Sequence, residues 1–227
     1  EFQNRDVNVD FYHVISQKTK EQVRSITDKP IKSIPFWVNQ NIWFEIENKD
    51  NLKKKYGIDK ETYCIGSFQR DTEGSDLITP KLSKGPDRLV KIIDSLNEKH
   101  KKIEVILTGK RRNYVIRELE KKNIQYKYFE MVNFSTINEL YNLLDLYIVS
   151  SRFEGGPQSI LECAATKTPI ISTDVGIAKE ILNESSIFNM ENFLDAKTDV
   201  EYAYKNVEKL FIPNGIENFN IYFKSLL

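Results

Sequence analysis

The chain has 227 residues, and its 33 basic residues balance 33 acidic ones, so the formal net charge is zero. A zero net charge gives no general attraction to nucleic acid or anionic lipid, and we expect no nucleic acid among the partners of this chain. Gly and Pro are sparse, at 9 and 7 residues, while 40% of the chain is hydrophobic, which favours a folded protein over a disordered one.

The first fifty or so residues lack the regular alternation of elements that follows. They hold one short apolar run, one polar helical segment and one strand-like segment, at Phe11–Ile15, Lys18–Ile26 and Ile31–Val38. We interpret residues 1–50 as the tail of a preceding domain and a linker. Three aromatic residues in this part are predicted to bury the domain junction, namely Trp37, Trp43 and Phe44. His13 is predicted to be a packed or a surface histidine rather than a catalytic one.

From about Glu61 onward, β-branched and aromatic runs alternate with segments that carry apolar residues at helical spacing. We predict strands at Thr62–Phe68, Ile103–Thr108, Tyr126–Met131, Leu146–Ser150, Pro169–Ser172 and Ser186–Asn189. We predict helices at Asp87–Glu98, Arg112–Lys122, Thr136–Asp145, Pro157–Thr166 and Ile177–Leu182. This pattern indicates an α/β fold over residues 51–210, a Rossmann-like doubly wound parallel sheet. Ligands bind at the carboxyl edge of such sheets, so the loops after the strands are where function is expected.

The end of the chain has a different pattern. Val200–Phe211 reads as a helix, Pro213-Asn214-Gly215 as a break, and Ile216–Leu227 as a last amphipathic helix. We therefore assign residues 211–227 to a C-terminal helix that packs away from the sheet.

Two further features bear on the location of the protein. Cys64 and Cys163 lie in apolar runs rather than in a close-spaced metal or redox pattern, which predicts two reduced thiols. No apolar stretch is long enough to cross a bilayer, and no charged-then-apolar leader opens the chain. We expect a cytoplasmic protein, at most peripheral on the inner face of the membrane. Because the chain begins at Glu1 without Met, we expect a fragment of a longer protein.

The most informative stretch runs from Ser150 to Glu162, where a strand ends, a glycine pair turns and Pro157 opens a helix. Gly155 and Gly156 let the backbone approach a ligand closely. Proline at the start of a helix leaves the amides of Gln158 and Ser159 unpaired, and the helix dipole adds positive potential there. The turn therefore predicts a seat for a phosphate group.

Two carboxylates flank this turn, Glu154 before it and Glu162 in the second turn of the helix. Carboxylates beside a phosphate would repel it. They make chemical sense if they accept hydrogen bonds from hydroxyl groups, because a carboxylate can take two from the vicinal diol of a sugar. A sugar nucleotide offers both a hexose and a ribose.

The stretch, with two Glu eight positions apart around a Gly-rich turn, resembles family four of the retaining GT-B-fold glycosyltransferases. The likeness continues through Thr168–Gly176, and through Tyr63–Arg70 with Lys84-Gly85, so that it covers roughly Glu61 to Leu182. The opening residues, Tyr12–Lys20 and Ile34–Asn39, resemble the end of that family's amino-terminal domain. The resemblance implies the C-terminal half of a GT-B fold.

What the resemblance implies about the site is more specific. It gives catalytic roles to Glu154, Arg70 and Lys84, with Glu154 binding the hydroxyls of the transferred sugar and the two cations neutralising the diphosphate leaving group. Glu162 would bind the ribose. The donor-binding set is Gly66, Ser67, Arg70, Lys84, Gly109, Met131, Val132, Glu154, Gly155, Gly156, Gln158, Ser159 and Glu162. Met131 and Val132 would lie at the nucleotide base.

The same resemblance implies the partners. A nucleoside-diphosphate sugar would be the donor, a saccharide or lipid-linked saccharide the acceptor, and transfer would retain the anomeric configuration. No cofactor is implied, and no metal, because no Asp-x-Asp pair stands in a suitable loop. The amino-terminal domain would supply acceptor binding, so the chain alone is expected to bind donor weakly and to turn over poorly.

The sequence departs from the family pattern at several places. The segment Asp71–Ser83 replaces a short spacer, so Lys81 could take the place of Arg70. Gln158 stands where many relatives carry a basic residue. The cluster Lys110 to Arg112 could add a third cation, or could be a charged helix start on a solvated face.

Two other functions stay open at this stage. One is a partner subunit that kept the fold and lost catalysis. The other is a nucleotide-sugar epimerase or a phosphorylase on the same two-domain architecture. Product analysis of the full-length protein would separate these enzymes from a transferase.

Overall fold

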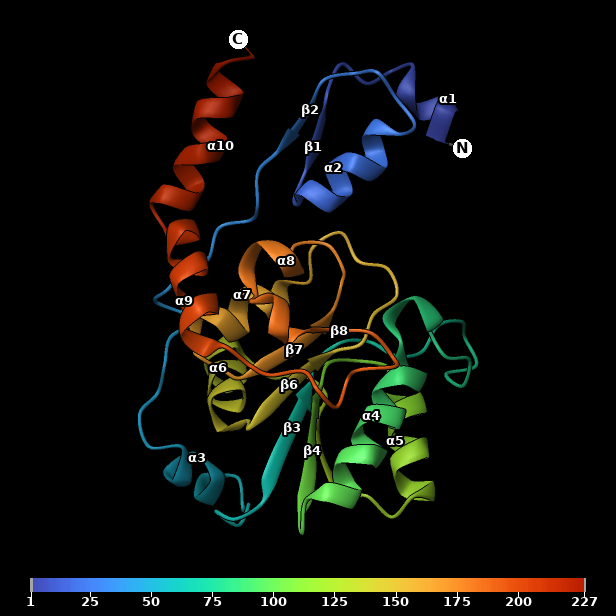
Figure 1. Ribbon diagram of the computed structural model, residues 1–227, viewed down its shortest axis with the longest axis vertical. Helices are drawn as coiled ribbons and strands as arrows, with labels where there is room; N and C mark the ends of the chain where they lie inside the picture. Colours follow the sequence, from blue (N-terminus) through green and yellow to red (C-terminus); the bar gives the residue numbers. More distant parts are fainter. Residues whose placement is uncertain (1, 227) are drawn as a thin grey trace.

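The main sheet of this computed structural model, which describes residues 2–226, contains six strands that are all parallel (Figure 1). Their order across the sheet is β5-β4-β3-β6-β7-β8. The strands are β3 (Tyr63–Ser67), β4 (Ile103–Thr108), β5 (Tyr126–Phe129), β6 (Leu146–Val149), β7 (Ile170–Thr173) and β8 (Ile187–Phe188). The chain winds outward from β3 in one direction and then from β6 in the other. The topological switch point, where ligands bind in such sheets, therefore lies between β3 and β6.

Helices cover both faces of the sheet, as the prediction of a doubly wound α/β fold required (Figure 1). On one face, α4 (Pro86–Lys99) and α5 (Asn113–Lys121) pack over Ile65, Leu107 and Ile148. On the other, α6 (Phe134–Leu143) and α7 (Gln158–Ala165) pack over Cys64 and Tyr147. Successive residues of a strand enter opposite core layers, because side chains alternate across a pleated sheet. The two layers fix the strands, and so fix the loops that follow them.

The remaining helices lie around this sandwich. They are the short helices η1 (Leu82–Lys84), α8 (Ala178–Ile181), η2 (Glu184–Ser186) and η3 (Glu208–Leu210), with α3 (Lys49–Lys55) and α9 (Val200–Val207). The predicted strands and helices of the sheet region are all present, with boundaries that move by a few residues. Helix α3 was not predicted, because its sequence is mostly Lys and Asn; Leu52 is its buried apolar residue.

A smaller unit precedes the sheet. It contains α1 (Phe2–Asp6), β1 (Tyr12–Val14), α2 (Gln17–Arg24) and β2 (Ile31–Ser33), and β1 pairs with β2 in parallel. The last helix, α10 (Asn214–Lys224), runs beside this unit and away from the main sheet (Figure 1). The rings of Phe11 and Tyr222 meet edge to face at 5.7 Å, and those of Trp37 and Phe219 at 5.2 Å.

The structure also tests the predictions made for the N-terminal and C-terminal segments outside the sheet. The expected break before the last helix is present, but it lies at residues 211–213 rather than 213–215, because α10 already begins at Asn214 after Pro213. Of the two alternatives left open for His13, the structure shows the packed one: its Nε2 lies 2.8 Å from the Ile34 carbonyl oxygen. Of the three aromatic residues expected to be buried, Trp43 is, whereas Trp37 and Phe44 are 44% and 47% exposed. Tertiary packing, which composition does not encode, decides this difference.

Both cysteines are buried and free, as the sequence predicted. Burial raises the pKa of the Cys64 thiol to about 12 and that of Cys163 well above its ordinary value, so both thiols stay protonated. No helix among residues 2–226 combines the length and apolar character that a bilayer crossing requires.

Candidate functional site

Lys84 and Glu154 meet at the switch point of the sheet. Lys84 ends the short helix η1, between β3 and α4, and Glu154 lies between β6 and α7. The Lys84 ammonium forms an ion pair with Glu154 Oε1, and the Ser151 hydroxyl donates to the same oxygen at 3.1 Å. The two side chains are 26% and 13% exposed. The structure thus brings together one cation and one carboxylate that the sequence predicted for the site.

The two loops that carry this pair are fastened to each other. The amide of Arg152 donates to the Ser83 carbonyl at 2.8 Å, and the Ser150 hydroxyl donates to the Gly85 carbonyl at 2.9 Å. Gly85 has a φ of 61°, and a Cβ there would collide with the Ser150 carbonyl oxygen. Only glycine fits this position without strain, since it has no Cβ.

A cavity of about 580 Å³ opens beside the pair. Its wall includes six charged residues, Lys18, Lys81, Lys84, Arg152, Glu154 and Asp174. Four are cations and two are carboxylates, so the lining carries an excess of two positive charges. Arg152 is held by two bonds to Asp87, at 2.7 and 2.6 Å, whereas no partner is found for the Lys81 ammonium within residues 2–226. The zero net charge of the chain therefore conceals a local excess of positive charge at this cavity.

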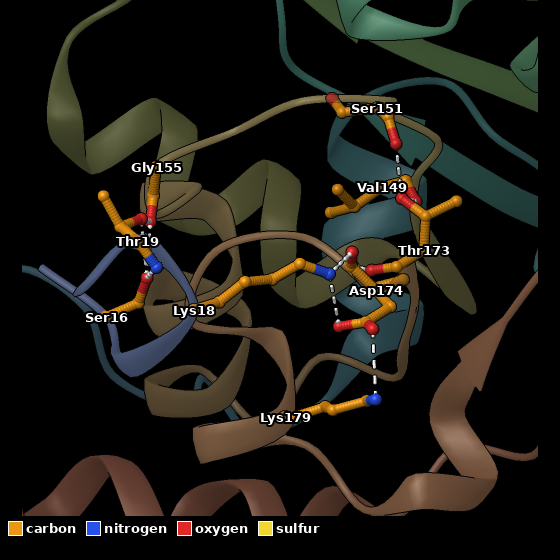
Figure 2. Close-up of polar contacts among 10 residues, drawn as sticks. Ser16, Lys18, Thr19, Val149, Ser151, Gly155, Thr173, Asp174 and Lys179 are labelled. Carbon is orange, nitrogen blue, oxygen red and sulfur yellow. Dashed lines mark hydrogen bonds and ion pairs between the residues drawn. The ribbon is translucent and has the colours of Figure 1, made fainter. Parts of the chain in front are cut away.

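Part of the cavity wall comes from α2, through Lys18, Thr19 and Gln22. Figure 2 shows the contacts of Lys18 and Thr19 with Asp174 and Gly155. The Thr19 hydroxyl donates to the Gly155 carbonyl oxygen at 3.1 Å, and the Ser16 hydroxyl lies 2.8 Å from Thr19 Oγ1. Lys18 contacts Asp174, whose other carboxylate oxygen is 3.0 Å from Lys179 Nζ. Burial alone would raise the pKa of Asp174, but the bonds from these two lysines outweigh it and hold that pKa below its ordinary value.

The turn before α7 differs from prediction in one detail. Pro157 is the residue that precedes the helix, with φ −59° and ψ 116°, rather than its first helical residue. The amides of Gln158 and Ser159 are still in the first turn, where a helix offers them no acceptor. A Cβ on Gly156 would stand 2.6 Å from Ile15 Cδ1, the end of a side chain that would have to shift, so the turn lies directly under the N-terminal unit.

Glu162 lies deeper than Glu154. Its Oε2 accepts a hydrogen bond from the Tyr141 hydroxyl at 2.6 Å. Burial raises the pKa of this carboxyl above its ordinary value, and the bond from Tyr141 opposes that rise.

The structure does not bring all of the predicted cations to the cavity. Arg70 is exposed and is not among the lining residues, whereas Lys81 is. The reason is the fold of the segment between them, which turns back on itself so that the amide of Lys81 donates to the Asp71 carbonyl at 2.8 Å. Both interpretations of Lys110 to Arg112 are wrong for Arg112, which is 1% exposed and bonds Asp71 Oδ2 through Nε at 2.9 Å.

The other predicted donor-binding residues are spread along the carboxyl half of the sheet. Gly66 is a strand residue covered by Leu144, and Ser67 is buried with its carbonyl accepting from Arg112 Nη1 at 2.6 Å. Gly109 follows β4 with a φ of 83° and accepts from the Tyr128 hydroxyl at 2.9 Å. Met131 is 72% exposed, and Val132 packs on the core under α6 and α7.

Four residues near the cavity received no role from the sequence: Ser16, Lys18, Thr19 and Asp174. They come from two segments far apart in the chain, so local pattern could not connect them. The one available signal was a serine just before the helical segment, which is typical of a helix N-cap. Ser16 is the N-cap of α2 and accepts from the Thr19 amide at 3.1 Å. Within residues 2–226, no three His, Cys, Asp or Glu residues gather as metal ligands would.

Comparisons with known proteins agree with this geometry. The sequence model of the family glycosyl transferases group 1 matches residues 78–212, more than half of the chain. An uncharacterized glycosyltransferase of Methanocaldococcus jannaschii is 26% identical over 179 residues, 74% of this chain. The O-antigen chain mannosyltransferase RfbU of Salmonella typhimurium is 27% identical over 191 residues, 77% of this chain. The chain spans about half the length of these two relatives, 43% and 52%.

Solved GT-B structures share the fold at low identity. HepE of Anabaena, in complex with UDP-glucose, superposes with a TM-score of 0.76 at 15% identity, over 96% of this chain and 64% of that one. A sucrose-phosphate synthase of Thermosynechococcus elongatus gives a TM-score of 0.75 at 14% identity, over 96% and 59%. Likeness at this identity concerns the architecture.

Proposed function

This chain belongs to the family glycosyl transferases group 1, and on that premise we propose that it is the donor-binding part of a retaining glycosyltransferase. It binds a nucleoside-diphosphate sugar in the cavity beside Lys84 and Glu154. The full-length protein transfers the sugar to a saccharide or a lipid-linked saccharide. That HepE of Anabaena was crystallised with UDP-glucose, and that RfbU is a mannosyltransferase, supports the class of donor.

The observation that carries this proposal is the Lys84–Glu154 pair at the switch point. A lysine paired with a carboxylate can exchange that partner for a phosphate oxygen when a donor enters. Glu154 is then free to accept hydrogen bonds from the hydroxyls of the sugar. The pair therefore binds the donor on both sides of the bond that breaks, Lys84 at the diphosphate and Glu154 at the sugar.

The charges of the cavity support a diphosphate as the bound anion. The excess of two positive charges on the lining is close to the charge of a sugar nucleotide's diphosphate. Lys81, the lining cation without a protein partner in the described part of the chain, would bind phosphate without first breaking an ion pair. The first-turn amides of α7 add hydrogen-bond donors from the other side.

In the proposed reaction, the bond between the anomeric carbon and the diphosphate oxygen breaks while the acceptor oxygen attacks from the same face. The acceptor proton passes to the departing diphosphate. Negative charge grows on that diphosphate in the transition state, and cations already in position lower the barrier. No cofactor takes part. NMR of the first product made by the full-length protein tests retention, since inversion would give the opposite anomer.

Donor binding is tested on the chain itself. Melting temperature is measured with UDP, GDP, ADP and their common sugars, because a ligand that binds only the folded state raises it. We expect one nucleotide series to raise the melting temperature, in a concentration-dependent manner. If none does at millimolar concentration, the proposed function is wrong.

A further inference from the structure

The hydroxyl of Tyr141 contacts Glu162, and nothing in the proposed reaction explains that contact. Tyr141 belongs to α6 and Glu162 to α7. The hydroxyl oxygen lies 2.6 Å from Glu162 Oε2, a short distance that is typical of a hydrogen bond to a charged acceptor. Tyr141 is only 1% exposed, so this bond is shielded from bulk water.

The ring of Tyr141 is held from several directions. It meets Trp43 edge to face at 5.8 Å and lies 4.7 Å from Phe68 and 5.5 Å from Tyr147. The Tyr141 carbonyl accepts from the Thr168 hydroxyl at 3.0 Å. A side chain fixed in this way loses little further entropy when it orients another group.

Both side chains lean toward the edge of the sheet where the cavity opens. Helices α6 and α7 begin after the carboxyl ends of β5 and β6 and run back along the sheet. Side chains of a helix tilt toward its N-terminus, so those of Tyr141 and Glu162 tilt toward that edge. Phe68, whose ring contacts that of Tyr141, directly follows the last residue of β3, so the Tyr141 ring lies near the carboxyl edge of the sheet.

The Glu162 carboxylate is only partly satisfied. It offers about four lone-pair sites. Within residues 2–226, Tyr141 is the donor the structure gives it. A partly buried charge with so few donors is costly, and the cost is expected where a ligand completes the set. The remaining sites suit a ligand that donates and carries no negative charge, which describes the hydroxyls of a sugar ring.

We propose that Tyr141 is a positioning residue, whose hydroxyl holds the Glu162 carboxylate in the orientation that accepts the vicinal ribose hydroxyls of the bound nucleotide. This inference rests on the proposed function, since the ribose belongs to the donor. It goes further by assigning the choice between ribonucleotides and deoxyribonucleotides to a pair of residues on neighbouring helices.

The proposal has a consequence for pH. Burial raises the pKa of Glu162 and the bond from Tyr141 opposes that rise, so removal of the hydroxyl must raise the pKa further. Ribose binding needs the ionised carboxylate. Affinity then falls as pH drops through this pKa, and the fall begins at a higher pH in a variant without the hydroxyl.

The test uses three variants. Tyr141→Phe keeps the ring and its packing but removes the hydroxyl. Glu162→Gln removes the titrating group. Tyr56→Phe is the matched control, because the Tyr56 hydroxyl makes a similar bond to Glu139 at 2.6 Å, where α3 meets α6. The probes are UDP, GDP and ADP with their 2′-deoxy and 2′,3′-dideoxy forms, and affinity is measured by calorimetry across pH.

We expect the preference for the ribonucleotide over its dideoxy form to fall about tenfold in Tyr141→Phe, as for the loss of one bond to a charged group. It should vanish in Glu162→Gln and stay unchanged in Tyr56→Phe. The carboxyl carbon of Glu162, labelled with ¹³C and assigned by its loss in Glu162→Gln, should titrate at a higher pH in Tyr141→Phe. An unchanged preference, or an unchanged titration midpoint, overturns the role of Tyr141 and leaves the donor site standing. Failure of every nucleotide to bind the unmodified chain overturns the proposed function, and the ribose role of Tyr141 with it.

Discussion

The Lys84 ammonium is paired with the Glu154 carboxylate, and under the proposed function it exchanges this partner for a diphosphate when a donor binds. Replacing Lys84 by Ala removes a charge-assisted bond to phosphate and leaves Glu154 as an uncompensated negative charge beside it. We expect nucleoside-diphosphate affinity to fall by tenfold or more, on the order of 1.5–3 kcal/mol. Isothermal calorimetry with the nucleotide found by thermal shift measures this directly.

Lys102→Ala is the matched control for that experiment. Lys102 also pairs with a carboxylate, Asp59 at 3.3 Å, but it precedes β4 at the amino edge of the sheet, far from the cavity. We expect its affinity to equal that of the unmodified chain. An equal loss in both variants, or no loss in Lys84→Ala, would remove Lys84 from the site.

Single residues also show how far the sequence could predict the site. The glycine turn and Glu154 follow from residue types at fixed spacing beside a strand end, whereas Lys84 is implied by the family resemblance. The structure puts that acid and that base in contact. The choice between Arg70 and Lys81 could not be predicted, because it depends on how the intervening loop folds back. The burial of Arg112 could not be predicted either, since its partner Asp71 is 41 residues away in the chain.

At the scale of elements, the junction between η1 and α4 depends on Gly85, whose φ of 61° is combined with contact to the Ser150 backbone. Gly85→Ala therefore has two costs, a left-handed backbone conformation that alanine disfavours and a steric clash of its Cβ with the Ser150 backbone. Gly57→Ala has only the conformational cost, because Gly57 has a φ of 65° and nothing lies within 4 Å of its added Cβ. We expect Gly57→Ala to lower the free energy of unfolding by about 1 kcal/mol and Gly85→Ala by roughly 2–4 kcal/mol. Urea denaturation of both variants gives the two values.

The difference in the free energy of unfolding between these two variants measures the cost of the clash between the added Cβ and the Ser150 backbone. Because the obstructing atom at Gly85 belongs to the backbone, relief must shift the loop that carries Ser150 and Glu154. Gly85→Ala should therefore also weaken nucleotide binding, while Gly57→Ala should not. Equal destabilisation in the two variants would mean that the loops at the switch point yield easily and do not hold each other in place.

The sheet itself was predictable because its strands are buried on both sides and so appear as continuous apolar runs. Their order across the sheet was not predicted, because right-handed crossovers do not fix where the direction of winding reverses. Element ends were less certain, as at Pro157, which precedes α7 instead of belonging to it. Helix α3 could not be found by periodicity, because its single buried apolar residue, Leu52, leaves no apolar stripe to detect.

For the molecule as a whole, the N-terminal unit meets the sheet region at the cavity mainly through polar contacts. Thr19 and Lys18 reach Gly155 and Asp174, and the amide of Gln17 donates to Glu180 Oε1 at 2.8 Å. Lys18 and Asp174 are each more than a third exposed, so salt screens their attraction. Because the pKa of Asp174 is lowered, the carboxylate stays charged well into mildly acidic solution. High salt, not mild acid, is what should loosen this contact.

Thr19→Val tests whether this contact holds the glycine turn. The substitution keeps the branched shape but removes the hydroxyl that donates to the Gly155 carbonyl. We expect amide hydrogen exchange to become faster in α2 and in the turn at Gly155, while the free energy of unfolding changes by about 1 kcal/mol or less, because local opening does not require global unfolding. Thr79→Val is the control, since the Thr79 hydroxyl bonds Asp76 at 2.6 Å within its own exposed loop. Exchange that stays unchanged in both segments of Thr19→Val would show that the remaining contacts, among them the bond from the Ser16 hydroxyl to the same carbonyl at 3.1 Å, hold the turn without Thr19.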